Sequence, residues 1–340
     1  MVELGPAFSP GWLPVTILST IGILTVLYAV QCLYSFLTLH LLTSKYPLNN
    51  YKRGGSECTH ALITGASAGI GLSIGKALVK QGFGVILLGH LPDELAQAKT
   101  LLQKLAPNAQ VRVIVMNART ATPSEMDSAV QSLSDLQVSI LVNNIGGMPI
   151  KLPPFRMFAT YSCDDIDATI NQNNRFMARL TTLMLPLLTK KEGGGRSLIL
   201  NLSSAAYVGM PYLVMYGATK GFVNSFSSGL ARELCSPNTP ETNHIDVLAI
   251  IPGEVHSQGN AHGVSASEPT SDVFAECIVR KAENAVKRNK RELRPWMMHD
   301  FQDWVLSLLL EGIRTREIGK ALEYKKDCFN GVWEKSMKDR

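Results

Sequence analysis

The feature that most constrains the fold is a strand–turn–helix–strand pattern in residues 59–90. The segment reads THALITGASAGIGLSIGKALVKQGFGVILLGH, with Gly65, Gly69 and Gly71 in its first turn. ALIT and FGVILLG predict short apolar strands, and LSIGKALVKQG predicts an amphipathic helix between them. Such a turn lets the backbone approach a pyrophosphate at a helix N-terminus, where N–H groups and the dipole favour anions. The order of the elements favours this site over a tight turn without a ligand.

A tyrosine and a lysine stand four residues apart in YGATK (216–220), shortly after the serine pair of NLSS (201–204). On a helix, positions i and i+4 share a face, so Tyr216 and Lys220 would point the same way. An ammonium beside a phenol would lower the tyrosine pKa from about 10 toward working pH. Such a phenol can exchange a proton with a substrate oxygen. An exposed helix with a chance pair is the alternative.

An uncharged stretch precedes this pattern. No charged side chain occurs in residues 4–44, and the apolar run 12–42 exceeds the roughly 20 residues that cross a bilayer. A cleaved signal peptide is the alternative, but it would need a basic start and a shorter apolar core. No Lys or Arg precedes the run, whereas Lys45, Lys52 and Arg53 follow it. The positive-inside rule therefore places the chain after the run in the cytosol.

The composition excludes several classes. Of 340 residues, 46% are hydrophobic and 18% charged, as in a globular protein, and the net charge of +5 does not by itself argue for nucleic acid. The six cysteines lie far apart without a C-x-x-C pair. This spacing fits neither a disulfide framework nor a zinc site, so we expect reduced thiols and no metal.

Six motifs fall in the order found in the short-chain dehydrogenase/reductase family, which the chain resembles from about residue 59 to residue 255. They are TGASAGIG (64–71), LVNNIGG (141–147), INQNNRF (170–176), NLSS, YGATK and IIPGEV (250–255). The resemblance implies a Rossmann-type α/β fold with a doubly wound parallel sheet. It also implies these cofactor contacts: Gly65, Ser67, Ala68, Gly69, Ile70, Gly71, His90, Asn117, Asn144, Gly146, Tyr216, Lys220, Pro252, Gly253 and Val255.

The resemblance also implies catalytic roles. Tyr216 would protonate a carbonyl oxygen as a hydride arrives, while Lys220 lowers the phenol pKa and binds the nicotinamide ribose. Asn173 matches the helix asparagine that holds a proton-relay water. The family also has a catalytic serine. Its usual spacing of thirteen residues to the tyrosine indicates Ser203 for this role, whereas alignment of the strand end indicates Ser204. Because adjacent strand residues point to opposite faces, only one can serve, and we favour Ser204.

The end of the second predicted strand favours NADPH over NAD. NAD enzymes usually place an acidic residue there for the ribose 2′-hydroxyl, whereas this chain has Gly89 and His90. The acidic pair Asp93 and Glu94 follows on the next predicted helix, facing solvent. Asn117 replaces the aspartate that the family commonly has near adenine, and the nearby Arg119 can add positive charge.

Finer features resemble one subgroup, the microsomal 3-ketoacyl-CoA reductases of very-long-chain fatty acid elongation and their 17β-hydroxysteroid dehydrogenase relatives. The resemblance implies a single-pass protein of the endoplasmic reticulum that reduces a 3-oxoacyl-CoA, with a homodimer and elongation-complex partners as further expectations. A relative that reduces a steroid or other lipophilic ketone stays open, because the end EKSMKDR (334–340) fits no dilysine motif and Pro252–Gly253 is retained. A catalytically silent NADP-binding scaffold is the alternative of another class.

The expected organisation has five parts: a tail (1–11), a transmembrane anchor (12–42), a linker (43–58), an NADP-binding reductase domain (59–255) and a substrate-covering C-terminal region (256–340). In the last part, FQDWVLSLLLEGI (301–313) is either an amphipathic lid or membrane surface, or an ordinary packed helix. KRNKRELR (287–294) is either a phosphate-binding or a solvated basic face. Three methionines near the site line an apolar pocket or belong to the core: Met148, Met210 and Met215.

Overall fold

The computed structural model describes residues 12–42, 47–54, 58–148, 153–190 and 193–338. The predicted tail 1–11 lies outside the described residues, as do 43–46 and 55–57 of the predicted linker. The chain divides into two compact units, residues 1–43 and 44–340. Each unit is described by itself.

The first unit contains one long helix, α1 (Trp12–Leu41). Its segment Pro14–Leu41 is long and apolar enough to cross a membrane by length and composition. At 1.5 Å per residue, 28 residues extend about 42 Å, which exceeds the roughly 30 Å of a hydrocarbon core. The hydroxyls of Thr20 and Thr25 donate to backbone carbonyls one turn earlier, at 2.8 Å each, so the helix satisfies these polar groups itself.

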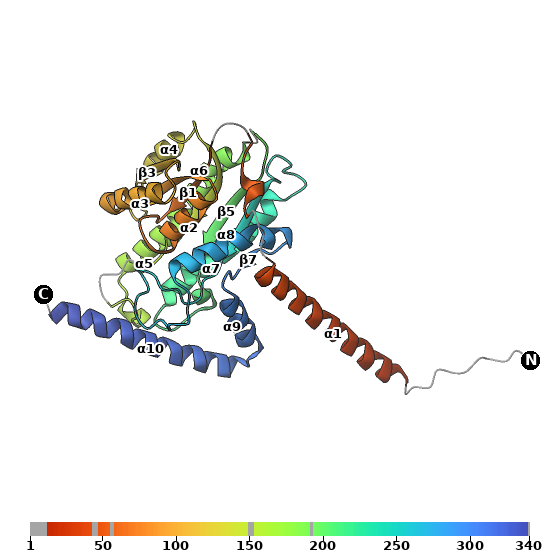
Figure 1. Ribbon diagram of the computed structural model, residues 1–340. Helices are drawn as coiled ribbons and strands as arrows, with labels where there is room; N and C mark the ends of the chain where they lie inside the picture. The colour runs from red at the N-terminus through yellow and green to blue at the C-terminus, as the bar shows by residue number, and fades with distance from the viewer. Residues whose placement is uncertain (1–11, 43–46, 55–57, 149–152, 191–192, 339–340) are drawn as a thin grey trace, which may run out of the picture. The chain divides into compact units, whose positions relative to one another are not determined.

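The second unit is built on a seven-stranded sheet in the order β3-β2-β1-β4-β5-β6-β7, with every neighbouring pair parallel (Figure 1). Most residues of the five central strands are buried, which explains their nearly continuous apolar runs. The predicted Rossmann-type parallel sheet is confirmed. The strands are β1 (Thr59–Thr64), β2 (Gly84–Gly89), β3 (Val111–Val115), β4 (Gln137–Asn143), β5 (Ser197–Leu202), β6 (Ile245–Ile250) and β7 (Glu292–Leu293).

Helices cover both faces of the sheet (Figure 1). The helices α3, α2 and α8 lie on one face, and α4, α6 and α7 pack the main apolar core against the other. Because a parallel connection is right-handed, the chain must reverse direction beside β1 to cover both faces. The helices are α2 (Gly69–Lys80), α3 (Pro92–Leu105), α4 (Pro123–Gln131), α5 (Cys163–Ile170), α6 (Phe176–Thr189), α7 (Val214–Leu234), α8 (Ser271–Lys287), α9 (Met297–Leu308) and α10 (Glu311–Lys338).

Part of the expected linker packs on the sheet. Tyr51 is 1% exposed, and its hydroxyl donates to Asp246 Oδ2 at 3.0 Å. Arg53 is also buried and donates to Val138 O at 3.2 Å and to Ser197 Oγ at 3.1 Å. Residues 47–54 therefore belong to the folded unit and close the N-terminal ends of β4, β5 and β6.

Two helices complete the C-terminal region. The stretch 301–313 is not one helix, because α9 ends at Leu308 and α10 begins at Glu311. This part is not the ordinary packed helix, because the outer side of α9 exposes large apolar side chains. They are Met297, Met298, Phe301, Trp304, Val305 and Leu308. The basic stretch 287–294 is partly neutralised, since Lys287 pairs with Glu283 and Arg294 with Asp303.

The turn between β1 and α2 depends on glycine. Gly65 and Gly69 have φ of +63° and +57°, a region that disfavours other residues. Gly71 lies so close to β1 that an added Cβ would stand 2.2 Å from Gly65 O. The helix thus begins within the predicted turn, at Gly69, and its first N–H groups face the end of β1.

We therefore expect Gly71→Ala to destabilise the protein by about 1–3 kcal/mol, because the new methyl group overlaps a backbone carbonyl. Gly75→Ala in the same helix is the matched control. Its Cβ would meet side-chain atoms only at 3.5 Å or more, so helix propensity favours it by up to about 1 kcal/mol. Thermal unfolding of the detergent-solubilised chain, followed by circular dichroism, measures both. Equal melting temperatures for the two variants would contradict the close approach.

Candidate active site

The site lies where the strand order reverses, between β1 and β4. Thr64 is the last residue of β1, and its Oγ1 accepts hydrogen bonds from the backbone N–H groups of Asn144 and Ile145 at 2.9 and 3.0 Å. The Asn144 amide donates to Thr64 O and Gly65 O at 3.0 and 3.1 Å. These contacts join the end of β1 to the residues that follow β4. They lie at the carboxyl ends of the strands, the usual ligand position in such sheets.

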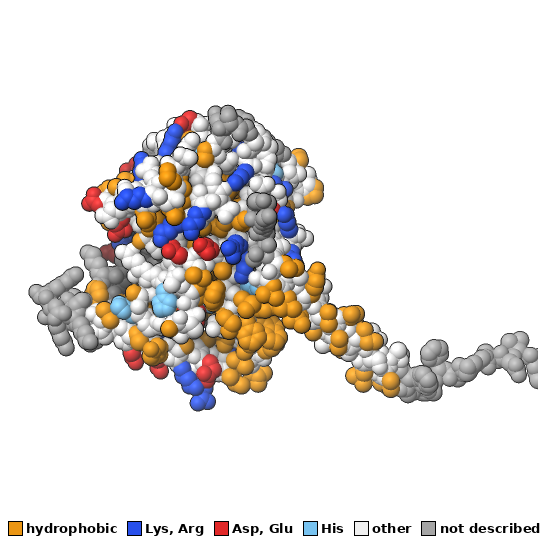
Figure 2. Space-filling view, in the orientation of Figure 1, with side chains coloured by type: hydrophobic (Ala, Val, Ile, Leu, Met, Phe, Trp, Pro, Cys, Tyr) orange, Lys and Arg blue, Asp and Glu red, His pale blue; other side chains and the backbone are white. Residues whose placement is uncertain are grey.

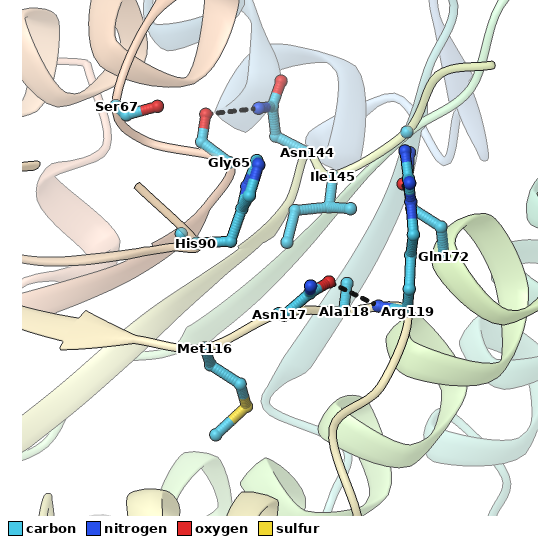
Figure 3. A pocket seen from close by; sticks show the side chains of 12 residues that line it. Gly65, Ser67, His90, Met116, Asn117, Ala118, Arg119, Asn144, Ile145 and Gln172 are labelled. Atoms are coloured by element: carbon cyan, nitrogen blue, oxygen red, sulfur yellow. Dashed lines mark hydrogen bonds between the residues drawn. The ribbon is translucent and has the colours of Figure 1, made fainter. Parts of the chain in front are cut away.

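A cavity of about 280 Å³ lies at these strand ends (Figure 3). It combines residues from the ends of four strands with one helical residue, Gln172. The residues predicted as cofactor contacts are Gly65, Ser67, His90, Asn117, Asn144 and Gly146, and Arg119 was expected nearby as added positive charge. The remaining lining residues are Gly89, Met116, Ala118, Ile145 and Gln172.

The outer end of the cavity is basic and polar. Arg119 donates from Nε to Gln172 Oε1 at 2.8 Å, and its backbone N–H donates to Asn117 Oδ1 at 3.0 Å (Figure 3). His90 is exposed at the end of β2. None of the described lining residues is acidic, and Asp93 lies exposed on α3.

The inner end of the cavity meets a buried ammonium. Lys220, on α7, is 4% exposed, and its Nζ donates to Leu202 O at 2.9 Å. Gly146 lines the cavity and lies beside this group, since an added Cβ would stand 2.6 Å from Nζ. Burial lowers the pKa of Lys220 to about 8, because the charged form loses hydration. Among the described residues, Leu202 is its one hydrogen-bond acceptor.

Tyr216 lies on the same helix, with Lys220 Nζ 5.5 Å from its ring centroid. Burial raises the pKa of Tyr216 above its ordinary value, and a side-chain hydrogen bond with Ser204 lowers it by less. The expectation that Lys220 lowers the phenol pKa is therefore wrong for this structure. The Lys220 ammonium donates to the Leu202 carbonyl, and burial is the largest influence on the pKa of Tyr216.

The two candidate serines have different surroundings. Ser203 is 3% exposed, and its hydroxyl donates to the Lys220 carbonyl at 3.0 Å. Ser204 is partly exposed, accepts from Ala206 N at 3.2 Å and lies close enough to Tyr216 to lower the pKa of its phenol. The hydroxyl of Ser204 faces the phenol, whereas that of Ser203 is engaged with the backbone.

Asn173 is held by a local irregularity in the helix that precedes α6. Residues Asn171–Arg175 form a π-helical turn, a widening that often occurs at functional sites. Asn173 is 1% exposed; its Oδ1 accepts from Gly147 N at 3.1 Å, and its Nδ2 donates to Gly147 O and Thr219 Oγ1 at 3.0 Å each. It therefore ties the end of β4 to α7 beside the tyrosine.

The loop after β6 completes the site. Ile250 O accepts from Ser203 N at 2.8 Å, and Pro252 O accepts from Ala205 N at 2.9 Å. The predicted residue Pro252 thus lies beside the serine segment, followed by Gly253.

An apolar cluster surrounds the phenol. Phe155, Leu213 and Leu322 form its buried part, and Met148, Met210 and Tyr216 pack against it. Leu322 comes from α10, so the C-terminal helix supplies a wall next to the reactive tyrosine. Two of the three methionines expected near the site are in this cluster.

The arrangement fits a nicotinamide dinucleotide. Ala68, Gly69, Ile70 and Gly71 open α2 without an acidic residue in its first turn, as a pyrophosphate requires. Lys220 Nζ has one acceptor among the described residues, so its other N–H groups can bind a ribose at this end of the cavity.

Sequence reasoning missed three contributors. Gln172 fixes Arg119, and its only signal is its place directly before Asn173. Thr219, inside YGATK, links Asn173 to the Tyr216 carbonyl, to which it donates at 2.8 Å. His299 contacts Gly253 from α9, and no local motif marks it.

Comparisons with known proteins agree with this site. The family model for short chain dehydrogenases matches residues 59–267. Two very-long-chain 3-oxoacyl-CoA reductases are similar to the chain. That of Anas platyrhynchos is 30% identical over 254 residues, with 73% of this chain and 75% of the relative covered. That of Pyricularia oryzae is 25% identical over 270 residues, with 78% of each covered.

Solved structures share the fold. A short-chain dehydrogenase from Sphingobium yanoikuyae in complex with NADPH has a TM-score of 0.57 at 22% identity, over 74% of this chain and 97% of that one. L-sorbose reductase from Gluconobacter frateurii, complexed with NADPH and L-sorbose, has a TM-score of 0.52 at 25% identity, over 61% and 73%. With the family match and the site geometry together, the chain belongs to the short-chain dehydrogenase/reductase family of oxidoreductases and resembles its very-long-chain 3-oxoacyl-CoA reductases.

Proposed function

We propose that this chain is a membrane-anchored, NADPH-dependent reductase that converts 3-oxoacyl-CoA to 3-hydroxyacyl-CoA in very-long-chain fatty acid elongation. The observation that carries the reaction type is the meeting of Tyr216, Ser204 and Lys220 beside Gly146, which lines the cofactor cavity. The names of the similar reductases support the substrate.

Each catalytic residue has a defined task. When bound, NADPH supplies the hydride. Tyr216 is the general acid, because its phenol is protonated at ordinary pH and can donate to a substrate oxygen. Burial raises its pKa, so the developing phenolate would need stabilisation as the proton leaves. Ser204 donates a hydrogen bond to the substrate carbonyl, while Ser203 fixes the helix that carries Lys220. Asn173 positions α7 through Thr219.

The cavity supports NADPH rather than NADH. A 2′-phosphate carries negative charge and needs positive or neutral neighbours. His90 and Arg119 lie at the outer end, and no described lining residue is acidic. Gln172 accepts from Arg119 Nε at 2.8 Å and so holds the guanidinium at the cavity, which both residues line.

The substrate pocket supports a lipophilic ketone. The apolar cluster of Phe155, Leu213 and Leu322 lies against Tyr216, and burying an acyl chain there is favourable by about 0.8 kcal/mol per CH₂. The residues of 59–255 would then bind the cofactor, and those of 256–340 would cover the substrate. A steroid or another lipophilic ketone would satisfy the same cluster and is the second candidate. Dimerisation and elongation partners stay predictions.

Two apolar surfaces support attachment to a membrane, whereas the endoplasmic reticulum and a cytosolic reductase unit stay predictions. The helix α1 can span a bilayer. Separately, apolar side chains gather on the outer side of α9 (Figure 2), with Trp304 54% and Leu308 65% exposed. A soluble monomer rarely exposes so many large apolar side chains together, whereas a membrane surface would cover them.

The first prediction tests the function itself. The detergent-solubilised chain should oxidise NADPH with a long-chain 3-oxoacyl-CoA, and more slowly with NADH. Tyr216→Phe should lose about 10²–10⁴ of kcat while still binding NADPH, because only the proton donor is removed. Absorbance loss measures turnover, and a 17-ketosteroid is the parallel substrate. Turnover on the steroid alone would replace the proposed substrate, and NADPH binding without turnover on either would support the scaffold alternative.

A serine pair gives a second prediction. Ser204→Ala should lower kcat about 10²-fold, because the carbonyl loses its hydrogen-bond donor. Ser203→Ala is the matched control and should change kcat less than about tenfold. It should instead lower the melting temperature slightly, since the Lys220 carbonyl loses its second donor and keeps only its helical bond, at a cost of about 0.5–1.5 kcal/mol. The reverse order of kcat losses would assign catalysis to Ser203.

The buried lysine gives a pH prediction. Burial lowers the pKa of Lys220 to about 8, so the ammonium is present below that pH and is lost as the pH rises through it. We expect kcat/KM for NADPH to fall above about pH 8, because this parameter reports the free enzyme. Lys220→Arg is the control, since its guanidinium stays charged and should remove the decline even at a lower rate. A flat wild-type profile from pH 7 to about pH 9.5 would contradict this assignment.

A further inference from the structure

A histidine from the C-terminal region holds the loop after β6. His299 lies in the first turn of α9 and is 4% exposed. Its Nδ1 accepts a hydrogen bond from Gly253 N at 3.2 Å, and its Nε2 lies 2.9 Å from Glu268 Oε2. Because Nδ1 accepts from an amide it carries no proton, so Nε2 carries one and donates to the carboxylate. The imidazole is thereby fixed in one tautomer.

The ring also packs directly on the glycine. A Cβ at Gly253 would lie 2.7 Å from His299 Cδ2 and 3.0 Å from Cγ. Phe274, fully buried on α8, lies near the same ring, with centroids 6.0 Å apart. The glycine and the histidine are therefore complementary, since a side chain at position 253 would push the ring away from its hydrogen bond.

A single peptide group connects this contact to the catalytic serine. The Pro252 carbonyl and the Gly253 N–H belong to one planar unit. Ala205 N donates to that carbonyl at 2.9 Å, and His299 accepts from that N–H. Ala205 directly follows Ser204, so the peptide is held at one end by the serine segment and at the other by His299.

We propose that His299 is a positioning residue that sets the plane of the Pro252–Gly253 peptide, with Glu268 fixing its tautomer. The peptide plane in turn sets the loop after β6 and the segment that carries Ser204. A misplacement of about 1 Å in such a constellation can cost about 10²-fold in rate. This inference rests on the proposed reductase function and adds a residue outside the Rossmann core to it.

Three substitutions separate the hydrogen bond from mere packing. In His299→Asn, Oδ1 takes the place of Nδ1 and can still accept from Gly253. In His299→Gln, the amide reaches toward Glu268 and leaves Gly253 without an acceptor. His299→Ala removes both contacts.

We expect kcat with NADPH and a long-chain 3-oxoacyl-CoA to fall about tenfold in His299→Gln and His299→Ala, as the loss of one hydrogen bond implies. His299→Asn should stay within about threefold of the wild type. KM for NADPH should change less than about threefold throughout, because most cofactor contacts lie in the distant cavity. A fold defect alone would lower kcat in step with the melting temperature and would not distinguish Asn from Gln.

Hydrogen exchange provides a readout that needs no turnover. In the cofactor-free full chain, the Gly253 amide, followed in a peptide covering 250–256, should exchange faster in His299→Gln than in His299→Asn or the wild type. If the wild type reduces no ketone but this order of exchange holds, the reductase function fails and the loop assignment stands. Equal exchange in the Asn and Gln variants, or equal kcat in the two, would overturn the proposal.

Discussion

The site depends on one ammonium that is taken out of water. Lys220 Nζ reaches the Leu202 carbonyl at the end of β5, stands against the bare Cα of Gly146 after β4, and belongs to the helix that carries Tyr216. Two strand ends and one helix therefore meet at a single charge. Its lowered pKa shows that desolvation is only partly offset there. A site that keeps such a charge poorly paired trades stability for binding, which is typical of functional positions.

The region outside the Rossmann core reaches this centre through one loop. His299 of α9 holds Gly253, and Lys325 of α10 forms an ion pair with Glu254, the next residue. The helix α10 also supplies Leu322 to the apolar cluster at Tyr216. The two helices thus contact the loop after β6 and the apolar cluster at Tyr216. A substrate that contacts the C-terminal region could therefore shift the loop after β6 and the surroundings of Tyr216.

The sequence predicted the parts of the site whose chemistry is local. The β1–α2 turn, Asn144 and the Tyr216–Lys220 pair follow from motifs in which neighbouring residues set each other's geometry. Contacts that join distant segments were not predicted. His299 and Gly253 are 46 positions apart, and the burial of Tyr51 depends on Asp246. The sign of the tyrosine pKa shift also failed, because burial is a property of the packed cluster and not of the i, i+4 spacing.

The pKa shifts of Tyr216 and Lys220 have one physical cause. Burial raises the pKa of Tyr216 and lowers that of Lys220, because in each case it penalises the charged form. Oxidation of an alcohol needs a phenolate to take the proton, whereas reduction of a ketone needs a phenol to give it. The phenol is neutral at ordinary pH even without burial, because its ordinary pKa is about 10. Its packing against Leu213 and Leu322 therefore acts on the phenolate, which alcohol oxidation requires and which burial makes costly to form.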